Sequence, residues 1–451
     1  MKIIKIISLI LFAAVIIVPL AFFNTETDAI SLIDNRKLAE NPFTAKGDIT
    51  QNIQNYVNDR IGFRDEMITA YTVLNDKLFH KMVHPSYSYG KDGFVFGAGM
   101  STSKKSTDFV VAFADMVAEI QEYCTARNVP FLFVFNPAKP AVYQDKIADG
   151  INYNREWVDL FLAELEKRNV NYLDNTATLT KLRENGVDGF NQKYDANHWN
   201  DMGAFYGTQA MLEQLSQNCD NIHVNKLEEF SQTEELKTSL LASKFPIEEY
   251  VPKLGSKASV TVRNKDYLGE LERHPSYQGF GYYVNHSEDV KDTPKVLVFQ
   301  GSYMNSYGNK FLMNAFSEYI HVHDYQNVLD FPYYFNIFQP ECVIFEVAEY
   351  TFTNQYFDYQ KMKGLNYNPP LSALEETMYT CQDIAIEDLV VEKGETLTKI
   401  TWQTEQTYPY VWMTLDNTYD MRKVEGGYQI TIETQRYEAA ADLLKIYSAI
   451  S

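Results

Sequence analysis

The chain has 451 residues, with 40 Lys and Arg against 60 Asp and Glu, which gives a formal net charge of −20 at pH 7. This acidic balance argues against a nucleic-acid partner, because binding to phosphates requires clustered cations that release counterions. Hydrophobic residues make up 45% of the chain, which excludes a disordered or low-complexity protein and allows about two or three domains. Neither a disulfide framework nor a zinc site is indicated by the widely spaced Cys124, Cys219, Cys342 and Cys381.

The first segment of the chain is strongly apolar. The run Ile6–Phe23 follows Lys2 and Lys5 and is just long enough to cross the hydrocarbon core of a membrane. Lysines before the run and acidic residues after it predict a cytoplasmic N-terminus, with the rest of the chain extracytoplasmic. We expect residues 1–24 to form a single-pass membrane anchor; a cleaved signal peptide, giving a secreted protein, is the alternative. Cytosolic cofactors would not reach such a protein, and we predict none.

Helices and apolar strands alternate along most of the chain. A helix over 49–82 and a hairpin at Asp92-Gly93 come first. Helices are then predicted at about 108–127, 155–167, 201–216 and 310–319, and short apolar strands at 131–135, 171–173, 296–299, 320–323 and 342–345. Continuous rather than alternating apolar strands are typical of a parallel sheet that is buried on both faces. The pattern therefore predicts an α/β fold, a three-layer arrangement with a parallel sheet covered by helices.

Two regions depart from this alternation. Residues 225–290 are polar and contain alternating stretches such as Ser259–Val262, which predicts a β-rich insertion. Residues 386–451 contain three predicted strands and form a small C-terminal β-rich region. We therefore expect the anchor, a catalytic domain over 25–385 that carries the insertion, and the C-terminal region.

One candidate for chemistry is Gln300-Gly301-Ser302-Tyr303, which follows a predicted strand and precedes a helix. Functional groups of parallel sheets collect at the carboxyl ends of the strands. A serine there can act as a nucleophile, with its own N–H oriented to bind an oxyanion. The simpler alternative is a turn in which the serine caps a helix.

A second candidate is the segment from Tyr194 to Asp201, which contains Asp195 and His198. An aspartate three residues before a histidine can orient the imidazole through Nδ1–H and leave Nε2 free as a general base. The alternative is a helix N-terminus with Asn200 as its cap and Trp199 in the core. Together the two segments supply a nucleophile, a base and an orienting acid on one edge of a sheet.

Asp-x-x-His followed downstream by Gly-Ser on a strand end resembles the SGNH-hydrolase-like domains of the DHHW protein family and the periplasmic alginate O-acetyltransferases. The resemblance extends over residues 29–355, through motifs at Asp34–Arg36, Asn58–Asp65, Gly90–Phe96, Asn136–Lys139, His198-Trp199, Gly301-Ser302 and Pro340–Glu349. It implies nucleophile Ser302, general base His198 and orienting acid Asp195. It also implies an anchored protein that moves acetyl groups onto an exported polysaccharide, with a membrane-bound O-acyltransferase as partner and acetyl donor.

Three positions depart from the family pattern. The acid lies two residues before the histidine in the alginate enzymes, but Asp195 lies three before His198. Gly301 replaces the Asp or Thr that precedes the serine. Tyr350 stands where an arginine often follows the last glutamate of the final strand motif, so no substrate contact is carried over to this position.

Other residues near the predicted strand ends are candidates for binding. The side-chain amides of Asn305 and Asn136 are candidate oxyanion donors. Candidates for substrate binding are Tyr303, Trp199, Glu346 and Glu349. The alternative for the two glutamates is pairing with Arg60 or Arg64. His321 and His323 suit a metal by spacing, but no third ligand stands at a fixed distance, so we predict no metal site.

The residues leave more than one function open. We expect an extracytoplasmic O-acetyltransferase that works through an acyl-serine, since the resemblance and the anchor place the site beside an exporting membrane. An extracellular carbohydrate esterase with the same triad, and a non-catalytic polysaccharide-binding or assembly protein, are the alternatives. The net charge of −20 would repel a polyuronate, so we expect a neutral or amino-sugar polymer.

Overall fold

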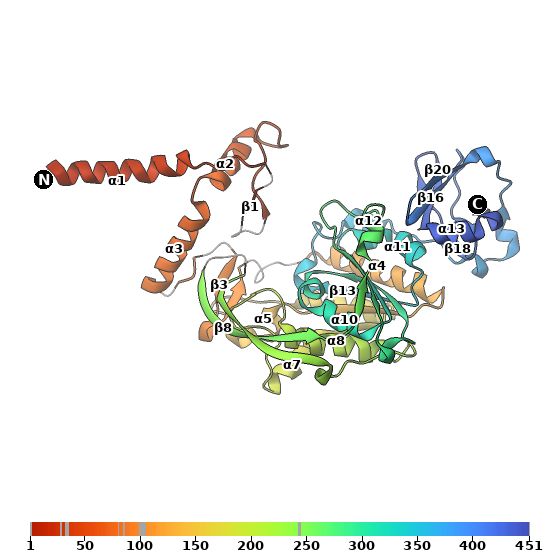
Figure 1. Cartoon of the computed structure of the whole chain (residues 1–451), viewed down its shortest axis with the longest axis horizontal. Helices are drawn as coiled ribbons and strands as arrows, with labels where there is room; N and C mark the ends of the chain where they lie inside the picture. The colour runs from red at the N-terminus through yellow and green to blue at the C-terminus, as the bar shows by residue number, and fades with distance from the viewer. Residues whose placement is uncertain are drawn as a thin grey trace.

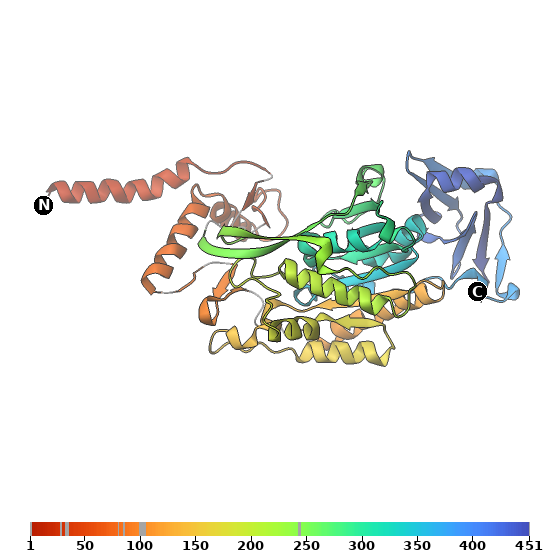
Figure 2. The same ribbon diagram turned by 60° about the horizontal axis from the view of Figure 1, so that its bottom comes forward.

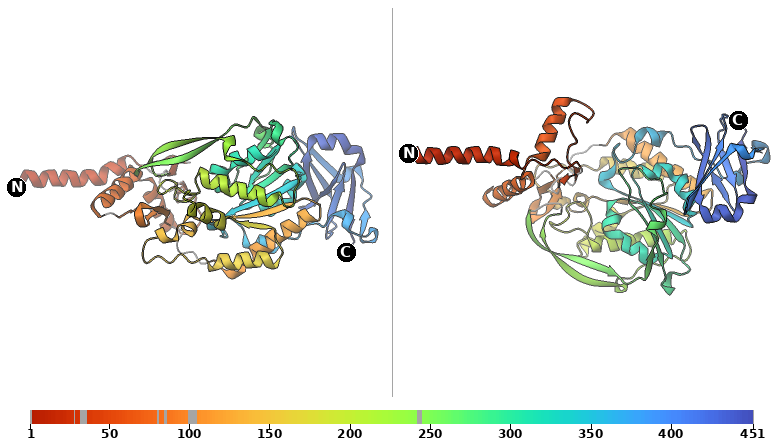
Figure 3. Two further views of the ribbon diagram at one scale, coloured as in Figure 1. Left: turned by 90° about the horizontal axis from the view of Figure 1, so that it is seen from below. Right: turned by 45° about the horizontal axis from the view of Figure 1, so that its top comes forward.

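The computed structural model describes residues 2–27, 29–31, 36–79, 81–83, 86–98, 105–241 and 245–450. Asp34 and Asn35 of the N-terminal motif lie outside these residues. Figure 1, Figure 2 and Figure 3 show the N-terminal helix and the C-terminal strands at opposite ends of the molecule, with an α/β body between them.

The N-terminal helix is the one expected from the apolar run. Helix α1 (Lys2–Ala21) contains Ile3–Ala21, a stretch of 19 residues with a mean hydropathy of 2.9 of which only 6% is buried. A helix of this length and composition can cross a membrane, and a signal sequence has the same features.

The body is built around one seven-stranded sheet, in the order β6-β5-β13-β11-β12-β10-β9. Its strands are β5 (Phe131–Asn136), β6 (Tyr172–Asp174), β9 (Val260–Val262), β10 (Phe280–Asn285), β11 (Lys295–Gln300), β12 (Glu318–His323) and β13 (Cys342–Ala348). The five strands from β6 to β12 are parallel, whereas β10 and β9 join antiparallel at one edge. The predicted fold class is confirmed, with a mixed rather than wholly parallel sheet.

Helices cover both faces of the sheet, which makes three layers. One face carries α4 (Thr107–Thr125), α6 (Glu156–Lys167), α11 (Phe331–Phe338) and α12 (Tyr359–Lys363). The other face carries α5 (Lys139–Val142), α7 (Asn175–Glu184), α8 (Asp201–Leu215) and α10 (Asn309–Ala315). Alternate residues of β5 enter the two cores: Phe131, Phe133 and Phe135 pack on the first, Leu132 and Val134 on the second. This explains why the strand sequence is apolar throughout.

The predicted insertion is only partly separate from the sheet. β7 (Phe230–Ser239) and β8 (Pro246–Ser256) form a long antiparallel hairpin. The sequence pattern assigns β9 and β10 to the same insertion, but both strands extend the main sheet at one edge. A short helix, α9 (Asn264–Tyr267), lies between β9 and β10.

The N-terminal part forms two helices where the sequence predicts one. α2 (Ile49–Arg60) and α3 (Arg64–Phe79) are separated at Gly62, whose backbone N–H bonds to Pro19 O at 2.9 Å. A Cβ at this glycine would lie 2.5 Å from Phe22 O, so the helix is interrupted where the chain meets the end of α1.

Short strand pairs precede and follow these helices: β1 (Ile30–Ser31) with β2 (Arg36–Lys37), and β3 (Tyr87–Tyr89) with β4 (Val95–Gly97). The turn between β3 and β4 is the predicted one, with positive φ at Asp92 and Gly93.

The C-terminal strands form two four-stranded antiparallel sheets. One contains β14 (Tyr379–Cys381), β17 (Val411–Thr414), β18 (Thr418–Asp420) and β21 (Lys445–Ala449), and the other β15 (Leu389–Lys393), β16 (Leu397–Gln403), β19 (Arg422–Val424) and β20 (Gly427–Glu433). α13 (Thr434–Ala440) follows β20. Asp420 contacts Arg127 and Asn336, which precede β5 and β13, so this region lies at the amino ends of the parallel strands.

Candidate active site

Ser302, His198 and Asp195 form one chain of hydrogen bonds. Ser302 Oγ lies 2.9 Å from His198 Nε2, and His198 Nδ1 lies 2.8 Å from Asp195 Oδ1. Ser302 follows the carboxyl end of β11 and begins a helical segment that runs through a π-helical turn, Met304–Gly308, into α10. The His198 side chain is 14% exposed and Ser302 is half-buried, so both remain open to solvent. Segments that are 104 residues apart in sequence therefore meet at one strand end.

Tyr303 and Trp199 hold these two segments together. The single O–H of Tyr303 is shared between two carbonyl acceptors, Asn197 O at 2.8 Å and Pro137 O at 2.9 Å. In return the Trp199 indole N–H donates to Tyr303 O at 3.0 Å. Both side chains are fully buried, so these bonds are shielded from water. The residues next to Ser302 and His198 thus fix the distance between the nucleophile and the base.

The loop before His198 is held by the β7–β8 hairpin. The Glu249 carboxylate of β8 accepts bonds from the backbone N–H groups of Gln192 at 2.6 Å, Lys193 at 3.0 Å and Tyr194 at 2.6 Å. Asp195 then adopts a φ of +51°, a left-handed conformation that aspartate tolerates better than most residues.

After the loop, α8 begins with Asn200 as its cap, since Asn200 Oδ1 accepts from Met202 N and Gly203 N. The helix cap and the candidate catalytic histidine therefore coexist in one segment.

Asp195 is ionised in this environment. Burial by itself raises the pKa of its carboxyl, but the bonds and charge of His198 and the bond from the Tyr307 hydroxyl outweigh burial and lower the pKa overall. Tyr307 donates to Asp195 Oδ2 at 2.8 Å. Asp195 Oδ1 accepts from His198 Nδ1–H, which leaves the lone pair of Nε2 facing Ser302.

Tyr350 is a site residue that the sequence does not predict. Its hydroxyl is hydrogen-bonded to Ser302 Oγ and lies 3.5 Å from His198 Nε2. Because the serine O–H points to the imidazole, the Tyr350 O–H is the donor to Ser302 Oγ. The signal in the sequence is the position of Tyr350 directly after Glu349, at the end of the strand motif that contains β13.

Beneath the serine lies a buried carboxyl. Glu346 Oε2 accepts from Gly301 N at 2.9 Å and Oε1 accepts from Asn136 Nδ2 at 2.7 Å. Burial, and then the charge of Asp324, raise the pKa of Glu346 to about 8. The folded chain therefore keeps a proton on Glu346 to a higher pH than the unfolded chain does, and the carboxyl supports the turn at Gly301 through its bond from Gly301 N.

Several predicted binding residues are corrected by their burial. Tyr303, Trp199 and Glu346 are fully buried and cannot contact a sugar. Glu349 is 4% exposed and is occupied by Arg155 Nε at 3.1 Å and the Tyr153 hydroxyl at 2.6 Å.

The alternative pairing partners and one oxyanion candidate are also corrected. Arg155, not Arg60 or Arg64, pairs with Glu349, because the Arg60 guanidinium is bound by backbone carbonyls such as Ala39 O at 2.9 Å. Asn136 is fully buried with both amide atoms engaged, its Oδ1 accepting from Asn175, so it is not placed as an oxyanion donor. Asn305 is half-buried, and its Oδ1 accepts from Gln300.

The histidines considered for a metal are used otherwise. His321 is buried and stacks on Tyr319 and Tyr283, and burial lowers its pKa to about 3. His323 bonds to Asp324 at 3.1 Å. Among the residues that the structure describes, no three His, Cys, Asp or Glu side chains are grouped to hold a metal ion.

The raised pKa of Glu346 predicts a pH dependence of stability. Between its ordinary value near 4.5 and about 8, the folded chain keeps a proton that the unfolded chain releases, so stability falls as pH rises through this window. Glu346→Gln should therefore lose less Tm between about pH 5.5 and pH 8.5 than wild type, whatever its absolute stability. Calorimetry of both proteins measures the two slopes, and the exposed Glu248→Gln should keep the wild-type slope. Equal slopes in Glu346→Gln and wild type would contradict the prediction.

The α/β body is similar to an SGNH-hydrolase-like domain. Residues 88–272 match the family model described as the SGNH hydrolase-like domain of the acetyltransferase AlgX. This confirms the resemblance stated from the motifs and supports acetyltransferase or SGNH-hydrolase-like activity. The matched segment contains Asp195 and His198 and ends before Ser302.

Solved structures with a similar fold include three from bacteria. PatB1 of Bacillus cereus is 16% identical, with 59% of this chain and 97% of that chain covered and a TM-score of 0.46. The O-acetyltransferase domain of Pseudomonas putida AlgJ is 15% identical, with coverage of 62% and 98% and a TM-score of 0.44. A DHHW family protein from Eubacterium siraeum is 12% identical, with coverage of 63% and 97% and a TM-score of 0.44. No curated protein sequence matches the chain.

Proposed function

We propose that the protein is an extracytoplasmic O-acetyltransferase that acetylates a polysaccharide through an acyl-Ser302 intermediate. The observation that carries this proposal is the bonded series Ser302–His198–Asp195, with distances of 2.9 and 2.8 Å. His198 and Asp195 lie in the segment that matches the model of an acetyltransferase family. A serine, an imidazole and an ionised carboxylate in this order supply a nucleophile, a general base and an orienting group.

The transfer takes place in two balanced steps. In the first, Ser302 Oγ attacks the acetyl carbonyl, its proton moves to His198 Nε2, and His198 returns that proton to the leaving group of the donor. In the second, a sugar hydroxyl attacks the acetyl-serine while His198 takes the hydroxyl proton. His198 then gives this proton back to Ser302 Oγ as the ester bond breaks.

The charge that forms on the carbonyl oxygen needs hydrogen-bond donors. We assign this role to the Ser302 backbone N–H and the side-chain amide of Asn305, which is partly exposed on the same helical segment. The Tyr350 O–H, which donates to Ser302 Oγ before acylation, keeps the lone pairs of the nucleophile oriented.

The substrate and the acetyl donor follow from charge and location. With a net charge of −20, the protein suits a neutral or amino-sugar polymer better than a polyuronate. If α1 stays in the membrane as a single-pass anchor, the 25–385 catalytic domain is held beside it. The acetyl group then comes across the bilayer from a membrane-bound O-acyltransferase partner.

Turnover of an aryl acetate by the full-length chain, solubilised in a detergent without sugar groups, tests the function. Acetylated oligosaccharide formed in the presence of acceptor, detected by mass spectrometry, supports transfer. Acetate release with no acetylated sugar would instead support the carbohydrate esterase. Turnover no faster than that of Ser302→Ala would leave only the non-catalytic polysaccharide-binding protein.

A further inference from the structure

The end of β12 brings two polar side chains beside the candidate active site. His323, the last residue of β12, is paired in parallel register with Gln300 of β11, two residues before Ser302. Neighbouring strands of a sheet lie about 4.8 Å apart, so His323 stands next to the turn that carries the nucleophile. The Tyr325 hydroxyl lies at the same turn, since a Cβ built on Gly301 would be 3.5 Å from its oxygen. The two-step mechanism above employs neither His323 nor Tyr325.

A buried carboxyl orients His323. The Nδ1 atom of His323 lies 3.1 Å from Asp324 Oδ1, and Asp324 has no exposed surface. The imidazole also packs against the Tyr325 ring, with the ring centroids 4.4 Å apart. Because an acid holds one ring nitrogen, the direction of the other nitrogen, Nε2, is fixed as well. His323 is therefore a pre-oriented hydrogen-bonding group rather than a freely rotating surface side chain.

His323 and Tyr325 each keep one polar atom without a partner. In the part of the chain that the structure covers, neither His323 Nε2 nor the Tyr325 hydroxyl forms a hydrogen bond. Neither atom is sealed from solvent, since the His323 side chain is 17% exposed and Tyr325 is 5% exposed. An imidazole nitrogen and a phenol hydroxyl can each bond to a sugar hydroxyl, which both donates and accepts. The two atoms therefore suit an uncharged polyhydroxy ligand.

Gly279 leaves a small space beside His323. A Cβ built at this glycine would lie 3.4 Å from His323 Cδ2 and 3.8 Å from the amide nitrogen of Asn305, both ordinary contacts. A methyl group would thus fit between the two side chains, and the glycine leaves that place open. Asn305 is the assigned oxyanion donor and follows Ser302 on the same helical segment. The space beside His323 therefore adjoins the acetyl group that Ser302 would carry.

Aromatic rings border the same place. The Tyr277 ring lies 5.5 Å from the His323 ring, and the His274 ring stacks on Tyr277 at 5.2 Å. Both Tyr277 and His274 are half-buried, so they remain partly open to solvent. Ring faces provide an apolar contact for the carbon–hydrogen face of a sugar, next to the hydrogen-bonding atoms of His323 and Tyr325.

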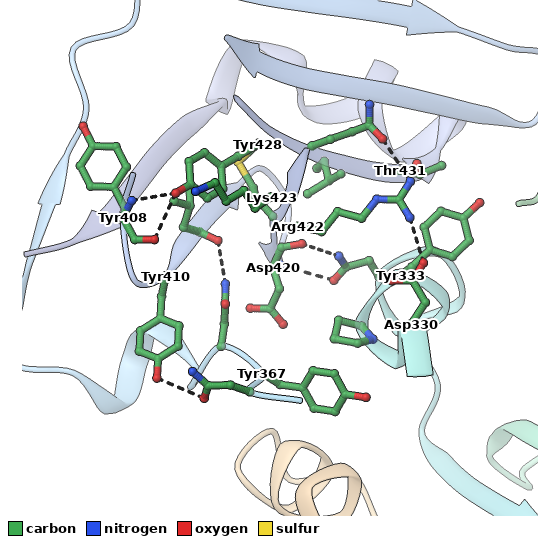
Figure 4. A pocket seen from close by; sticks show the side chains of 18 of the residues that line it. Asp330, Tyr333, Tyr367, Tyr408, Tyr410, Asp420, Arg422, Lys423, Tyr428 and Thr431 are labelled. Carbon is green, nitrogen blue, oxygen red and sulfur yellow. Dashed lines mark hydrogen bonds and ion pairs between the residues drawn. The ribbon is translucent and has the colours of Figure 1, made fainter. Parts of the chain in front are cut away.

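Another hollow, between the α/β body and the C-terminal strands, is built differently. Its volume is about 290 Å³, and the Arg422 guanidinium that faces it is already paired with Asp330 at 2.9 Å (Figure 4). This hollow lies at the amino ends of the parallel strands, whereas Ser302 follows the carboxyl end of β11. A group bound there is too far from Ser302 to react at it.

We propose that His323 and Tyr325 bind the acceptor sugar, so that its reacting hydroxyl meets the acetyl group on Ser302. This inference rests on the proposed function for the reaction, and on the open His323 Nε2 and Tyr325 hydroxyl for the site. His198 takes the proton of the sugar hydroxyl in the second step, so His323 and Tyr325 supply only hydrogen bonds that position the sugar. Water gains nothing from a site for a sugar ring. The site therefore favours transfer to a sugar over hydrolysis of the acetyl-serine.

The ratio of acetylated sugar to free acetate tests the proposal. Both products come from the same acetyl-serine, so the ratio does not depend on how fast that intermediate forms. The full-length chain in sugar-free detergent receives aryl acetate with a hexamer of β-1,4-linked glucose or of β-1,4-linked N-acetylglucosamine, and both products are quantified. His323→Asn, which keeps an amide nitrogen for Asp324 but lacks Nε2, should lower the ratio at least about tenfold. Tyr325→Phe should lower the ratio at least about fivefold.

Matched comparisons separate sugar binding from folding. Tyr325→Phe removes a hydroxyl that has no partner, so Tm should stay unchanged or rise while the ratio falls, which a purely structural role does not produce. His323→Gln, whose amide can reach the place of Nε2, should keep more of the ratio than His323→Asn does. The exposed His286→Asn, at the amino end of β12, should keep the wild-type ratio. With methanol as the acceptor, which has no sugar ring, the ratio should not change in any variant.

An unchanged ratio in His323→Asn and in Tyr325→Phe would overturn the acceptor site and leave the proposed function standing. Acetate release by wild type without any acetylated hexamer would overturn the site and leave the esterase. If wild type shows no turnover, the proposed function is removed, and calorimetry with the Ser302→Ala chain decides the site. Adding His323→Asn to that chain should then weaken hexamer binding at least about tenfold. Equal binding by the two chains, or none, removes the site as well.

Discussion

Ser302→Ala is expected to lower kcat for aryl-acetate turnover at least about 10³-fold, because no acyl-enzyme can form without the Ser302 hydroxyl. The methyl group that remains cannot form the hydrogen bond that joins Ser302 Oγ to His198 Nε2 at 2.9 Å in wild type. The measurement is the initial rate of phenolate release by the full-length chain, compared with wild type at the same pH. His198→Ala should cause a loss of similar size, since members of one catalytic unit do not contribute additively.

Ser306→Ala is the matched control for this change. Ser306 is exposed and lies four residues further along the same helical segment, so the substitution should leave the rate within about twofold of wild type. Equal Tm values for the three variants would show that folding is unaffected. Retained turnover in Ser302→Ala, or in His198→Ala, would remove that residue from the site.

The approach of Ser302 to His198 was predictable from sequence because both segments stand at recognisable places in an α/β pattern. The Gly-Ser pair follows an apolar strand, and Asp-x-x-His precedes a capped helix. Parallel strands bring their carboxyl ends to one edge, so two such segments converge without any knowledge of the side chains between them.

The environment of the series was not predictable. The hydroxyl groups of Tyr307 and Tyr350 contact Asp195 and Ser302 because the folded backbone brings these residues together. The chain has 32 tyrosines, so no single tyrosine stands out in the sequence. Glu346 was misassigned for a related reason: a carboxylate after an apolar strand suggests a binding group. Its full burial and its bond from Gly301 N show instead a group that supports the turn at Gly301.

The β-rich segments show a similar limit. Alternating residues predict strands in the 225–290 region, but they do not state which sheet a strand joins, and β9 and β10 complete the main sheet. The single helix predicted over 49–82 is divided into two at Gly62, because this residue packs closely against Phe22, a tertiary contact that local sequence does not show. Local sequence patterns thus predict the helices and strands, whereas long-range contacts determine which sheet a strand joins and where a helix ends.

Asp195→Asn is expected to lower kcat by about 10³ to 10⁴-fold with little change in Tm. The neutral amide removes the charge that stabilises the imidazolium, and it no longer requires the tautomer with the proton on Nδ1. Asparagine tolerates the left-handed φ of +51° at this position, so the loop keeps its shape, which Asp195→Ala would not ensure. Steady-state rates with aryl acetate, together with Tm, provide the measurement.

The Asp195→Asn prediction tests which group orients His198. Asp195 lies three residues before His198, and its bond of 2.8 Å to Nδ1 makes it the candidate for the orienting acid. The exposed Asp188→Asn, which keeps an oxygen for the Tyr143 hydroxyl, should stay within about twofold of wild type. A loss in Asp195→Asn no larger than that of Asp188→Asn would mean that another group orients His198. Tyr307→Phe removes only the bond to Oδ2 and should cost about three- to tenfold, since the charge of Asp195 remains.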